Sequence, residues 1–541
     1  MTLTGTRSFD VLIRGGRVAD GNGGPLRRAD VGIRGDTVVE IGDLTAATSA
    51  STIDATGLVV APGFVDVHTH SDITILVNSN AESAIRQGVT TQVFPNCGMG
   101  LAPAIGEART DVEDRTRAFD IDVDWTTVGD YYDRVEAAHP SINVVPMVAQ
   151  GTVRMAVMGY RQGVPSPDEM AAMKAHVTEA MQSGARGMCS GLRYVPSGYA
   201  KVEELAELAS IVHQFGGVYA THMRSEGDNG EWLEAIDEAL AVGERSGVRV
   251  QISHMKALGS ESWGRSAEAL ARIEMAVARG IDVAADQYPY AATSSTLLVL
   301  FPQWSQEGGV DALVDRLADP DQERRIREAF AATLAMRGGP TRMTVSEYAP
   351  EPELQGKSLA EVAREKKASE FSASVGMLRE SQGHVSMIYH TLEEDDIETI
   401  FQRPFVMVAS DGSAVAPYGA LAADYYPHPR NYGCFPRVLG DFVRTRRLVD
   451  VGEAVRKMTA LPAERFNLDR RGQLKPGWHA DITLFDPETV SDRATFARPR
   501  EYPEGIRYVF VNGELVLDHE NHTGRHPGRV LRAPLGAGDL N

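Results

Sequence analysis

Residues 63–72 read GFVDVHTHSD, an apolar run that ends in two histidines separated by one threonine. On an extended strand His68 and His70 point to the same face, because side chains alternate with a period of two. Two imidazoles on one face of a strand can chelate a metal ion. Seven more short apolar runs follow in the chain, and their order decides the fold.

The eight apolar runs lie in the middle of the sequence and are separated by longer segments. They are GFVDVHTH, TTQVFPNCG, INVVPMVAQG, ARGMCSGL, VYATHM, RVQISHMK, DVAADQYPY and FVMVASDG. Most are followed by amphipathic segments such as VEELAELASIVHQFG, whose apolar residues recur at helical spacing. Alternating strands and helices predict a parallel sheet, and eight such units predict an α/β fold of the (β/α)8 barrel type. A doubly wound sheet with fewer strands remains an alternative.

The two ends of the chain have a different pattern, in which apolar and polar residues alternate between Gly-rich turns. Asn512 and Gly513 suit a type I′ hairpin turn, which needs two residues that tolerate positive φ. The two ends therefore predict one small β-sandwich domain. The seventh and eighth apolar runs are more than 100 residues apart, which predicts an inserted subdomain or lid. The expected boundaries are 1–62 plus 465–541 for the β-domain, 63–464 for the barrel and 295–349 for the insertion.

The composition is that of a globular enzyme, with 43% hydrophobic and 24% charged residues in 541. A net charge of −20 argues against a nucleic-acid partner, because phosphate binding needs a basic face. We expect no membrane partner and a cytoplasmic location, since no run of 18 apolar residues and no secretory signal is present. The three cysteines, Cys97, Cys189 and Cys434, are widely spaced and odd in number, so no disulfide framework is expected.

Chemically reactive residues stand at the ends of the predicted strands. They are His68 and His70 on the first strand, Cys97 on the second, His222 on the fifth, His254 on the sixth and Asp411 on the eighth. Because the carboxyl ends of all barrel strands meet at one face, these six residues should lie together. Each one alone has a plainer explanation, such as a core histidine or a turn-forming aspartate. Their shared placement favours a metal site, and a thiolate combined with imidazoles favours zinc over magnesium or calcium.

These motifs resemble the amidohydrolase superfamily over nearly the whole chain, including TALPAERFNLDRRGQLKPGWHADITLFDP near the C-terminal end. FPNCG, ATHMRSEGD and QISHMK look like the N-acyl-D-amino-acid deacylase (D-aminoacylase) branch. The resemblance implies one tightly bound zinc on Cys97, His222 and His254. It also implies a second, weaker metal site of His68, His70 and Asp411. Many relatives bridge two metals with a carboxylated lysine or a glutamate from the fourth strand, and ARGMCSGLRY ends without either.

We therefore expect a zinc-dependent amidohydrolase that converts N-acyl-D-amino acids into a carboxylate and a free D-amino acid. The stereochemical preference rests on the resemblance alone. As a hypothesis, zinc would polarise the amide carbonyl and lower the pKa of a water from about 15.7 toward about 7. Asp411 would then carry the water proton to the leaving nitrogen.

The α-carboxylate of such a substrate needs a cationic or hydrogen-bonding partner. The resemblance points to Lys256, Tyr288 and Ser294 for this role. A solvated loop lysine is the alternative explanation for Lys256. The segment GLRYVPSGYA is expected to line the acyl or side-chain pocket, and Arg193 and Arg224 either attract an acidic side chain or form ion pairs at the rim.

Three other functions stay open at this point. A cyclic-amide hydrolase of the hydantoinase or dihydroorotase kind would use the same barrel, although such enzymes usually depend on the bridging lysine. A non-catalytic amidohydrolase-like barrel would bind no metal. A nucleophilic hydrolase would use Cys97 with a histidine base and no metal. The preferred acyl group and side chain, the number of metals and the formation of a homo-oligomer are not determined by the sequence.

Overall fold

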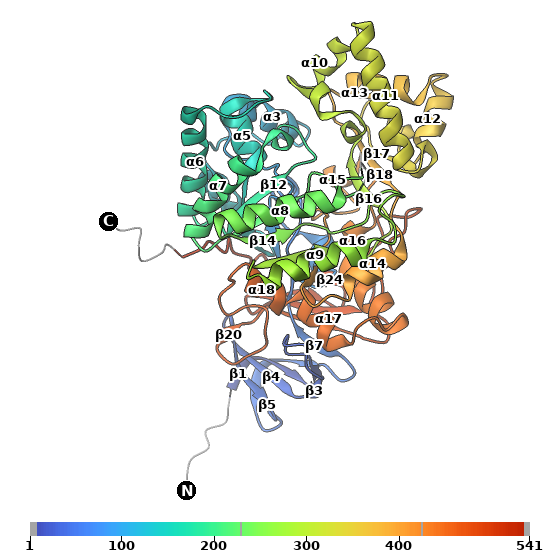
Figure 1. Cartoon of the computed structure of the whole chain (residues 1–541). Coiled ribbons are helices and arrows are strands. Elements are labelled where there is room, and N and C mark those ends of the chain that lie inside the picture. Colours follow the sequence, from blue (N-terminus) through green and yellow to red (C-terminus); the bar gives the residue numbers. More distant parts are fainter. Residues whose placement is uncertain (1–7, 228–229, 424–425, 535–541) are drawn as a thin grey trace.

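The computed structural model describes residues 8–227, 230–423 and 426–534. Its centre is a barrel of parallel strands, with a β-domain at one end and an inserted unit at the other (Figure 1). Each of the eight predicted apolar runs contains one barrel strand. In order they are β8 (Phe64–Asp66), β9 (Val89–Phe94), β10 (Asn143–Pro146) continued by β11 (Val148–Ala149), β12 (Gly187–Gly191), β13 (Val218–His222), β14 (Arg249–Ile252), β15 (Val283–Gln287) and β19 (Val406–Val408).

Neighbouring barrel strands pair in parallel from β8 through β19. The barrel closes between its last and first strands, where Thr69 forms a parallel bridge with Gly412. The backbone N–H of Asp411 donates to the carbonyl of His68 at 2.9 Å across the same seam. The prediction of a (β/α)8 barrel is confirmed, and the closure brings the first and eighth strand ends together.

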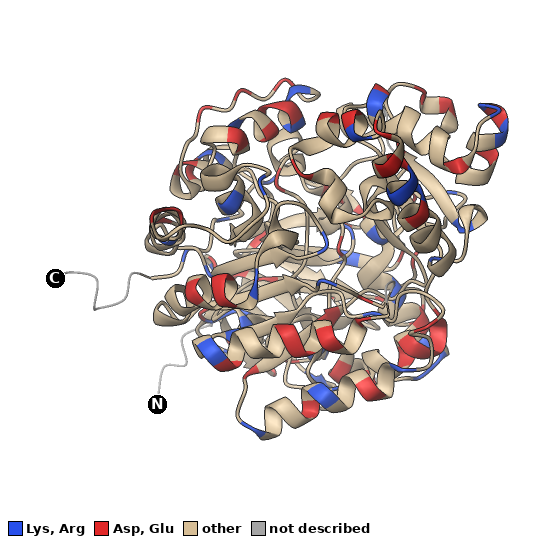
Figure 2. Cartoon of the chain, turned by 45° about the horizontal axis from the view of Figure 1, so that its top comes forward, with Lys and Arg blue, Asp and Glu red and all other residues tan. Residues whose placement is uncertain are grey.

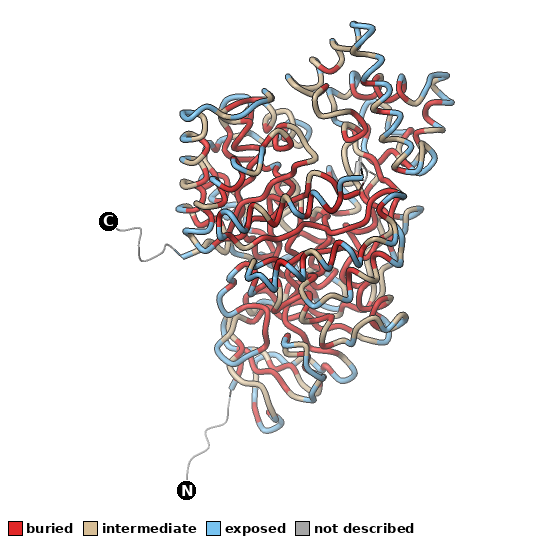
Figure 3. Tube along the Cα trace, in the orientation of Figure 1, coloured by how far each residue is buried: buried red, intermediate tan, exposed pale blue. Residues whose placement is uncertain are grey.

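Helices surround the barrel, and several of them have one apolar face that packs on it. In α7 (Val202–Gln214) the residues Leu205, Leu208, Ala209 and Val212 are buried, at the spacing of three and four residues that places them on one side. The other surrounding helices are α1 (Thr74–Val77), α2 (Glu82–Ile85), α3 (Gly106–Arg117), α4 (Val128–Ala137), α5 (Gln150–Met158), α6 (Pro167–Gln182), α8 (Trp232–Ser246), α9 (Ser266–Ala278), α14 (Glu394–Phe401), α15 (Ala420–Ala423), α16 (Arg430–Arg437), α17 (Val451–Met458) and α18 (Ala460–Arg465). Figure 3 shows that the barrel strands are buried while outer helices such as α6, α7 and α8 have exposed residues on one side.

The β-domain is built from both ends of the chain. One sheet has the order β20-β5-β4-β1-β6, and the other has the order β24-β23-β22-β21-β7-β2-β3. Its N-terminal strands are β1 (Ser8–Arg14), β2 (Arg17–Val18), β3 (Arg27–Arg28), β4 (Asp30–Arg34), β5 (Thr37–Gly42), β6 (Thr48–Asp54) and β7 (Val59–Pro62). Its C-terminal strands are β20 (Trp478–His479), β21 (Ile482–Phe485), β22 (Ile506–Val511), β23 (Glu514–Asp518) and β24 (Asn521–His522).

The two sheets share one apolar core, which includes Ile13 and Val31 from one sheet and Ile482 and Phe510 from the other. The turn between β22 and β23 has φ values of 48° at Asn512 and 82° at Gly513. Positive φ at both central residues is the requirement of a type I′ turn, so the hairpin prediction is confirmed. We propose 1–62 plus 465–541 and 63–464 as the boundaries of the β-domain and the barrel.

The insertion between β15 and β19 has its own antiparallel sheet of β16 (Thr293–Thr296), β18 (Ser386–Tyr389) and β17 (Met343–Glu347). Its helices α10 (Gly309–Arg316), α11 (Pro320–Met336), α12 (Leu359–Glu365) and α13 (Glu370–Glu380) pack on a separate apolar core. That core continues to Tyr389. We therefore propose that the inserted unit spans 293–390, beyond the expected 295–349.

Acidic and basic residues are interspersed along the outer helices in the view of Figure 2. Within the described ranges, no helix combines the length and the apolar character needed to cross a bilayer.

Candidate metal centre

The six predicted reactive residues converge at the carboxyl ends of the barrel strands. Cys97 lies at the middle of the cluster, with its Sγ 3.3 Å from His68 Nε2, 3.6 Å from His222 Nδ1 and 3.4 Å from His254 Nε2. On the other side of the cluster, Asp411 Oδ1 lies 3.1 Å from His70 Nε2 and 3.5 Å from His68 Nε2. The residues that the sequence places at five different strand ends therefore form one site.

The ligand atoms fall into two overlapping groups in which all atoms lie within 4.8 Å of one another. One group is Cys97, His222 and His254, and the other is His68, His70, Cys97 and Asp411. Cys97 belongs to both groups, whereas the resemblance places it in the first alone. A thiolate at this position can therefore serve a metal in either group or bridge two metals.

The sulfur–nitrogen distances in the first group fit a zinc ion, whereas His222 Nδ1 and His254 Nε2, 2.9 Å apart, are closer than the roughly 3.3 Å that two tetrahedral zinc bonds require. Zinc bonds of about 2.3 Å to sulfur and about 2.0–2.1 Å to nitrogen, set at tetrahedral angles, separate sulfur from nitrogen by roughly 3.5 Å. The separations of Cys97 Sγ from His222 and His254, 3.6 and 3.4 Å, lie close to this value. The donor set also fits, because thiolate and neutral imidazole are the ligands that zinc prefers.

The electrostatics of the cluster point to a cation as well. Burial raises the pKa of the Cys97 thiol well above its usual range, so a thiolate there requires positive charge beside it. Burial lowers the pKa of His222 to about 3, and it also lowers the pKa of His68. Both imidazoles are therefore neutral at pH 7, which is the form that binds metals.

Three cluster residues have a backbone conformation that side chains other than glycine rarely adopt. The φ angles are 52° at Cys97, 35° at His254 and 50° at Asp411. Such positions cost on the order of 1–3 kcal/mol each and persist only where surrounding contacts hold them. At His254 the backbone N–H donates to Asp286 Oδ1 at 2.7 Å, which is one such contact. All three strained positions carry side chains of the cluster.

The loop that carries Cys97 packs directly on the end of β12. A Cβ atom at Gly191 would lie 1.9 Å from the carbonyl oxygen of Cys97, so only glycine allows this approach. The loop after Gly191 places the ring of Tyr194 at 4.8 Å from the ring of His222. β12 reads GMCSG and supplies neither lysine nor glutamate, in agreement with the sequence.

Asp411 is ionised in this setting. Burial acts to raise its pKa, but Arg430 and the neighbouring imidazoles outweigh burial and lower the pKa well below its usual range. Arg430 Nη1 lies 2.7 Å from Asp411 Oδ2, which leaves Oδ1 facing His68 and His70. The carboxylate is thus held by Arg430 on one side and presents an ionised oxygen to the cluster on the other.

Lys256 is 3% exposed and lies within the cluster, so it is not a solvated loop lysine. Its Nζ donates to Glu226 Oε1 at 2.5 Å and to the backbone carbonyl of His254 at 2.8 Å. Tyr288 presents its ring 5.6 Å from Lys256 Nζ. The Tyr288 hydroxyl is buried and has no hydrogen-bond partner among the described residues, so it is ready to bind a group from a ligand.

The remaining predicted residues lie farther from the cluster. Ser294 is half-buried on β16 of the insertion, and no hydrogen bond between described residues joins it to the metal ligands. Arg224 forms an ion pair with Glu238 and donates to the carbonyl of Ala200, which fits the expectation of rim ion pairs. Arg193 donates to the carbonyl of Val299 and so links the loop after β12 to the insertion.

Two residues of the site were not predicted from the sequence. Glu226 stands four residues after His222 in ATHMRSEGD, on a loop where strand periodicity no longer applies. Arg430 is the first residue of α16, 19 positions after Asp411. A cation was needed beside the buried Asp411, but no spacing rule identifies which arginine supplies it.

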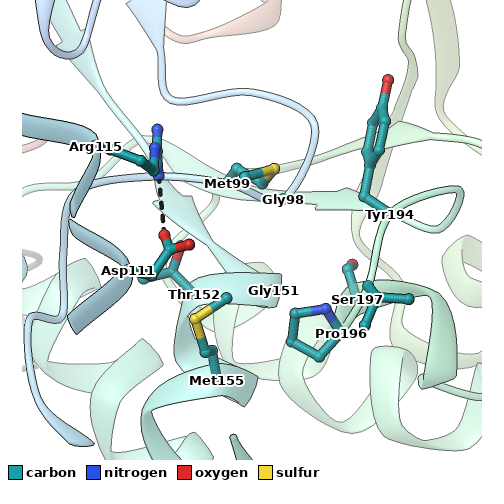
Figure 4. Close-up of a pocket in the computed structure, with 11 residues that line it drawn as sticks. Gly98, Met99, Asp111, Arg115, Gly151, Thr152, Met155, Tyr194, Pro196 and Ser197 are labelled. Atoms are coloured by element: carbon teal, nitrogen blue, oxygen red, sulfur yellow. Dashed lines mark hydrogen bonds and ion pairs between the residues drawn. The ribbon is translucent and has the colours of Figure 1, made fainter. Parts of the chain in front are cut away.

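A small pocket lies beside the Cys97 loop (Figure 4). Gly98 and Met99, which follow Cys97 directly, form one wall, and Met155 and Pro196 form others. The cavity volume is about 10 Å³, which is room for one water-sized group. The ion pair between Arg115 and Asp111 is part of the lining.

Comparisons with known proteins agree with this geometry. The model of the Amidohydrolase family matches residues 51–517. A D-aminoacylase from Alcaligenes xylosoxydans xylosoxydans is 39% identical over 98% of this chain and 99% of the relative. The crystal structure of an N-acyl-D-glutamate deacylase from Bordetella bronchiseptica, complexed with zinc and a phosphonate inhibitor, has a TM-score of 0.83 at 34% identity and covers 97% of this chain and 100% of that chain. A D-aminoacylase with a binuclear metal centre has a TM-score of 0.81 at 38% identity, with the same coverage.

A closed parallel barrel with histidine, cysteine and aspartate at its strand ends is typical of metal-dependent hydrolases with a (β/α)8 fold. The matches over nearly the whole chain show that it belongs to the amidohydrolase family, in the D-aminoacylase branch.

Proposed function

We propose that this chain hydrolyses the amide bond of N-acyl-D-amino acids and releases a carboxylate and a free D-amino acid. The observation that carries the proposal is the position of Cys97 between two ligand groups, on a barrel whose fourth strand offers no bridging lysine or glutamate. The D-aminoacylase and the N-acyl-D-glutamate deacylase resemble the chain over nearly its full length, which supports a linear N-acyl amino acid as substrate.

For the metal, we propose one tightly held zinc on Cys97, His222 and His254, and a second, weaker site on His68, His70 and Asp411. When bound, zinc supplies a Lewis acid for the amide carbonyl and favours ionisation of water. His222 and His254 are more buried than His70, whose side chain is 35% exposed. His68 and Asp411 are as buried as the ligands of the first group, so the support for weaker binding in the second group is the exposed side chain of His70.

Asp411 acts as the proton shuttle in this proposal. Its ionised carboxylate takes a proton from the attacking water through Oδ1, and Arg430 holds Oδ2 during the transfer. The same oxygen then delivers the proton to the amide nitrogen, because an amine anion is too poor a leaving group to depart unprotonated. His70, 3.1 Å from Oδ1, helps to hold this oxygen toward the cluster.

The α-carboxylate of the substrate is proposed to contact Lys256, Tyr288 and Ser294. Two observations support this assignment: the buried Tyr288 hydroxyl has no partner among the described residues, and Lys256 Nζ lies 2.8 Å from His254 Nδ1. The segment GLRYVPSGYA is proposed to line the acyl or side-chain pocket, and its residues from Tyr194 to Ser197 line the small cavity beside Gly98 and Met99.

Replacing Lys256 by methionine tests the carboxylate assignment. A hydrogen bond to a charged group is worth about 1.5–3 kcal/mol, so KM for N-acetyl-D-amino acids should rise roughly 10- to 100-fold. The KM for the matching N-acetyl amine, which lacks the carboxylate, should change little. The kinetics are measured on variant protein with verified zinc content, and an equal rise for both substrates would remove Lys256 from the binding site.

The function itself is tested by a panel of N-acetyl D- and L-amino acids, with hydantoin and dihydroorotate as cyclic amides. We expect turnover of the D series to exceed that of the L series. Liberated amine is measured alongside zinc content. Faster turnover of the L series or of a cyclic amide would contradict the proposal, and the cyclic-amide result would favour the hydantoinase-type alternative.

The two remaining alternatives predict different results in the same experiment. A non-catalytic barrel would contain no zinc and hydrolyse none of the panel. A nucleophilic hydrolase that uses Cys97 would accumulate a stoichiometric acyl-enzyme without zinc. The contact of Cys97 with three imidazoles within 3.6 Å favours a metal ligand over a free nucleophile.

A further inference from the structure

Glu226 connects the outer sides of the two histidines that complete the Cys97 group. The nitrogens that face Cys97 are Nδ1 of His222 and Nε2 of His254. The opposite nitrogens face Glu226, with Nδ1 of His254 at 2.9 Å from Oε1 and Nε2 of His222 at 3.6 Å from Oε2. A single buried carboxylate therefore lies against both imidazoles on the side away from the thiol.

The tautomers of the two rings follow from this arrangement. A nitrogen that gives its lone pair to a metal carries no proton, so the proton of each neutral ring stands on the opposite nitrogen. Nδ1 of His254 then donates to Glu226 Oε1, and Nε2 of His222 directs its proton toward Oε2. Lys256 Nζ lies 2.8 Å from the same protonated Nδ1, so it cannot donate to that nitrogen and directs its protons to Glu226 Oε1 and to the carbonyl of His254 instead. Carboxylates in this outer position fix the ring orientation and increase the basicity of the metal-facing nitrogen.

Glu226 also neutralises a buried cation next to the metal ligands. Lys256 Nζ lies 2.8 Å from Nδ1 of His254 and 2.5 Å from Glu226 Oε1. Without the carboxylate, an ammonium would stand against the histidine that holds a dication, which is unfavourable in a buried site. The main chain of Glu226 is anchored beside the site, since its carbonyl accepts from the N–H of Leu258 at 2.8 Å.

We infer that Glu226 is a positioning residue of the metal centre, which orients His254 and His222 through their outer nitrogens and compensates the charge of Lys256. This inference rests on the zinc site that the proposed function includes, but not on the identity of the substrate. It gives the glutamate of ATHMRSEGD a role separate from those of the ligands and of the proton shuttle.

The test measures zinc affinity by competition with a chromogenic chelator, in wild-type protein and in Glu226→Gln. Loss of an outer carboxylate typically weakens metal binding 10- to 100-fold, and we expect a loss in this range. Glu234→Gln is the matched control, because Glu234 is an exposed residue of α8 in the same part of the chain. It should bind zinc as wild type does.

A double variant, Glu226→Gln with Lys256→Met, separates charge compensation from loss of folding. Removing the uncompensated ammonium should restore part of the zinc affinity that Glu226→Gln loses. Wild-type affinity in Glu226→Gln would overturn the inference, and so would a double variant that binds zinc no better than the single one. The assay contains no substrate, so these outcomes do not depend on which amide the enzyme cleaves. Wild-type protein without measurable zinc affinity would overturn the zinc site together with this inference.

Discussion

Cys97→Ala should lose its tightly bound zinc and, with it, all measurable amide hydrolysis. Cys97 Sγ lies within 3.6 Å of three imidazole nitrogens and belongs to both groups of ligand atoms. Protein zinc sites have apparent binding free energies of about 10–16 kcal/mol spread over about four ligands, so one ligand contributes roughly 3 kcal/mol, or about 10²-fold in affinity. Zinc content after dialysis and turnover of N-acetyl-D-amino acids are the two measurements.

Cys189→Ala is the matched control for this prediction. Cys189 is a fully buried cysteine on β12, and it is outside both ligand groups. Its replacement should lower thermal stability slightly and leave zinc content unchanged. Full zinc content in Cys97→Ala would show that the sulfur is not a ligand.

Asp411→Asn should keep its zinc and lose catalysis. The amide has the size of the carboxylate but cannot accept the water proton, and general acid–base catalysis contributes about 10²- to 10⁴-fold to the rate. We expect kcat to fall by on the order of this factor while the zinc on Cys97, His222 and His254 remains. The measurements are kcat, zinc content and the thermal midpoint, which reports whether Arg430 tolerates the loss of its anionic partner.

The control for Asp411→Asn is Asp395→Asn, a substitution at an exposed residue of α14. It should retain wild-type kcat. Wild-type-like kcat in Asp411→Asn would exclude Asp411 as the proton shuttle and would direct attention to another base in the cluster.

The fold could be predicted from the sequence because its main signals are local. Short apolar runs that alternate with amphipathic helices define a parallel sheet, and the positions of His68, Cys97, His222, His254 and Asp411 follow from their places after strand ends. Barrel closure then brings them together without further information. The hairpin at Asn512 and Gly513 was predictable for the same reason, since the turn type depends on two adjacent residues.

Other features depend on contacts that no local pattern encodes. The insertion ends with β18, which pairs with β16 across about 90 residues of intervening chain, so its far boundary has no sequence signal. Arg430 and Glu226 lie on a helix and on a loop, where neither strand nor helix periodicity points to the barrel mouth. The positive φ angles at Cys97, His254 and Asp411 also require the folded barrel, because isolated chains avoid them.

The burial of Lys256 excludes one of the two explanations that the sequence allowed for this residue and modifies the other. From the sequence, Lys256 was weighed between a substrate-binding residue and a solvated loop lysine. Its burial excludes the solvated state, and its contact with Glu226 gives it a partner inside the protein. A substrate carboxylate would therefore join an existing ion pair between Lys256 and Glu226. The rise in KM of Lys256→Met measures how strong that additional contact is.

The central claim is that residues from strand ends far apart in the chain bind one cation together, and that the sulfur of Cys97 is one of its ligands. X-ray absorption at the zinc edge, recorded on wild-type protein and on the zinc-retaining Cys189→Ala control, tests this claim most directly. The account predicts one sulfur scatterer at about 2.3 Å and nitrogen scatterers at about 2.0–2.1 Å in both proteins, because Cys97 and not Cys189 supplies the sulfur. A wild-type zinc surrounded by nitrogen and oxygen alone would contradict it.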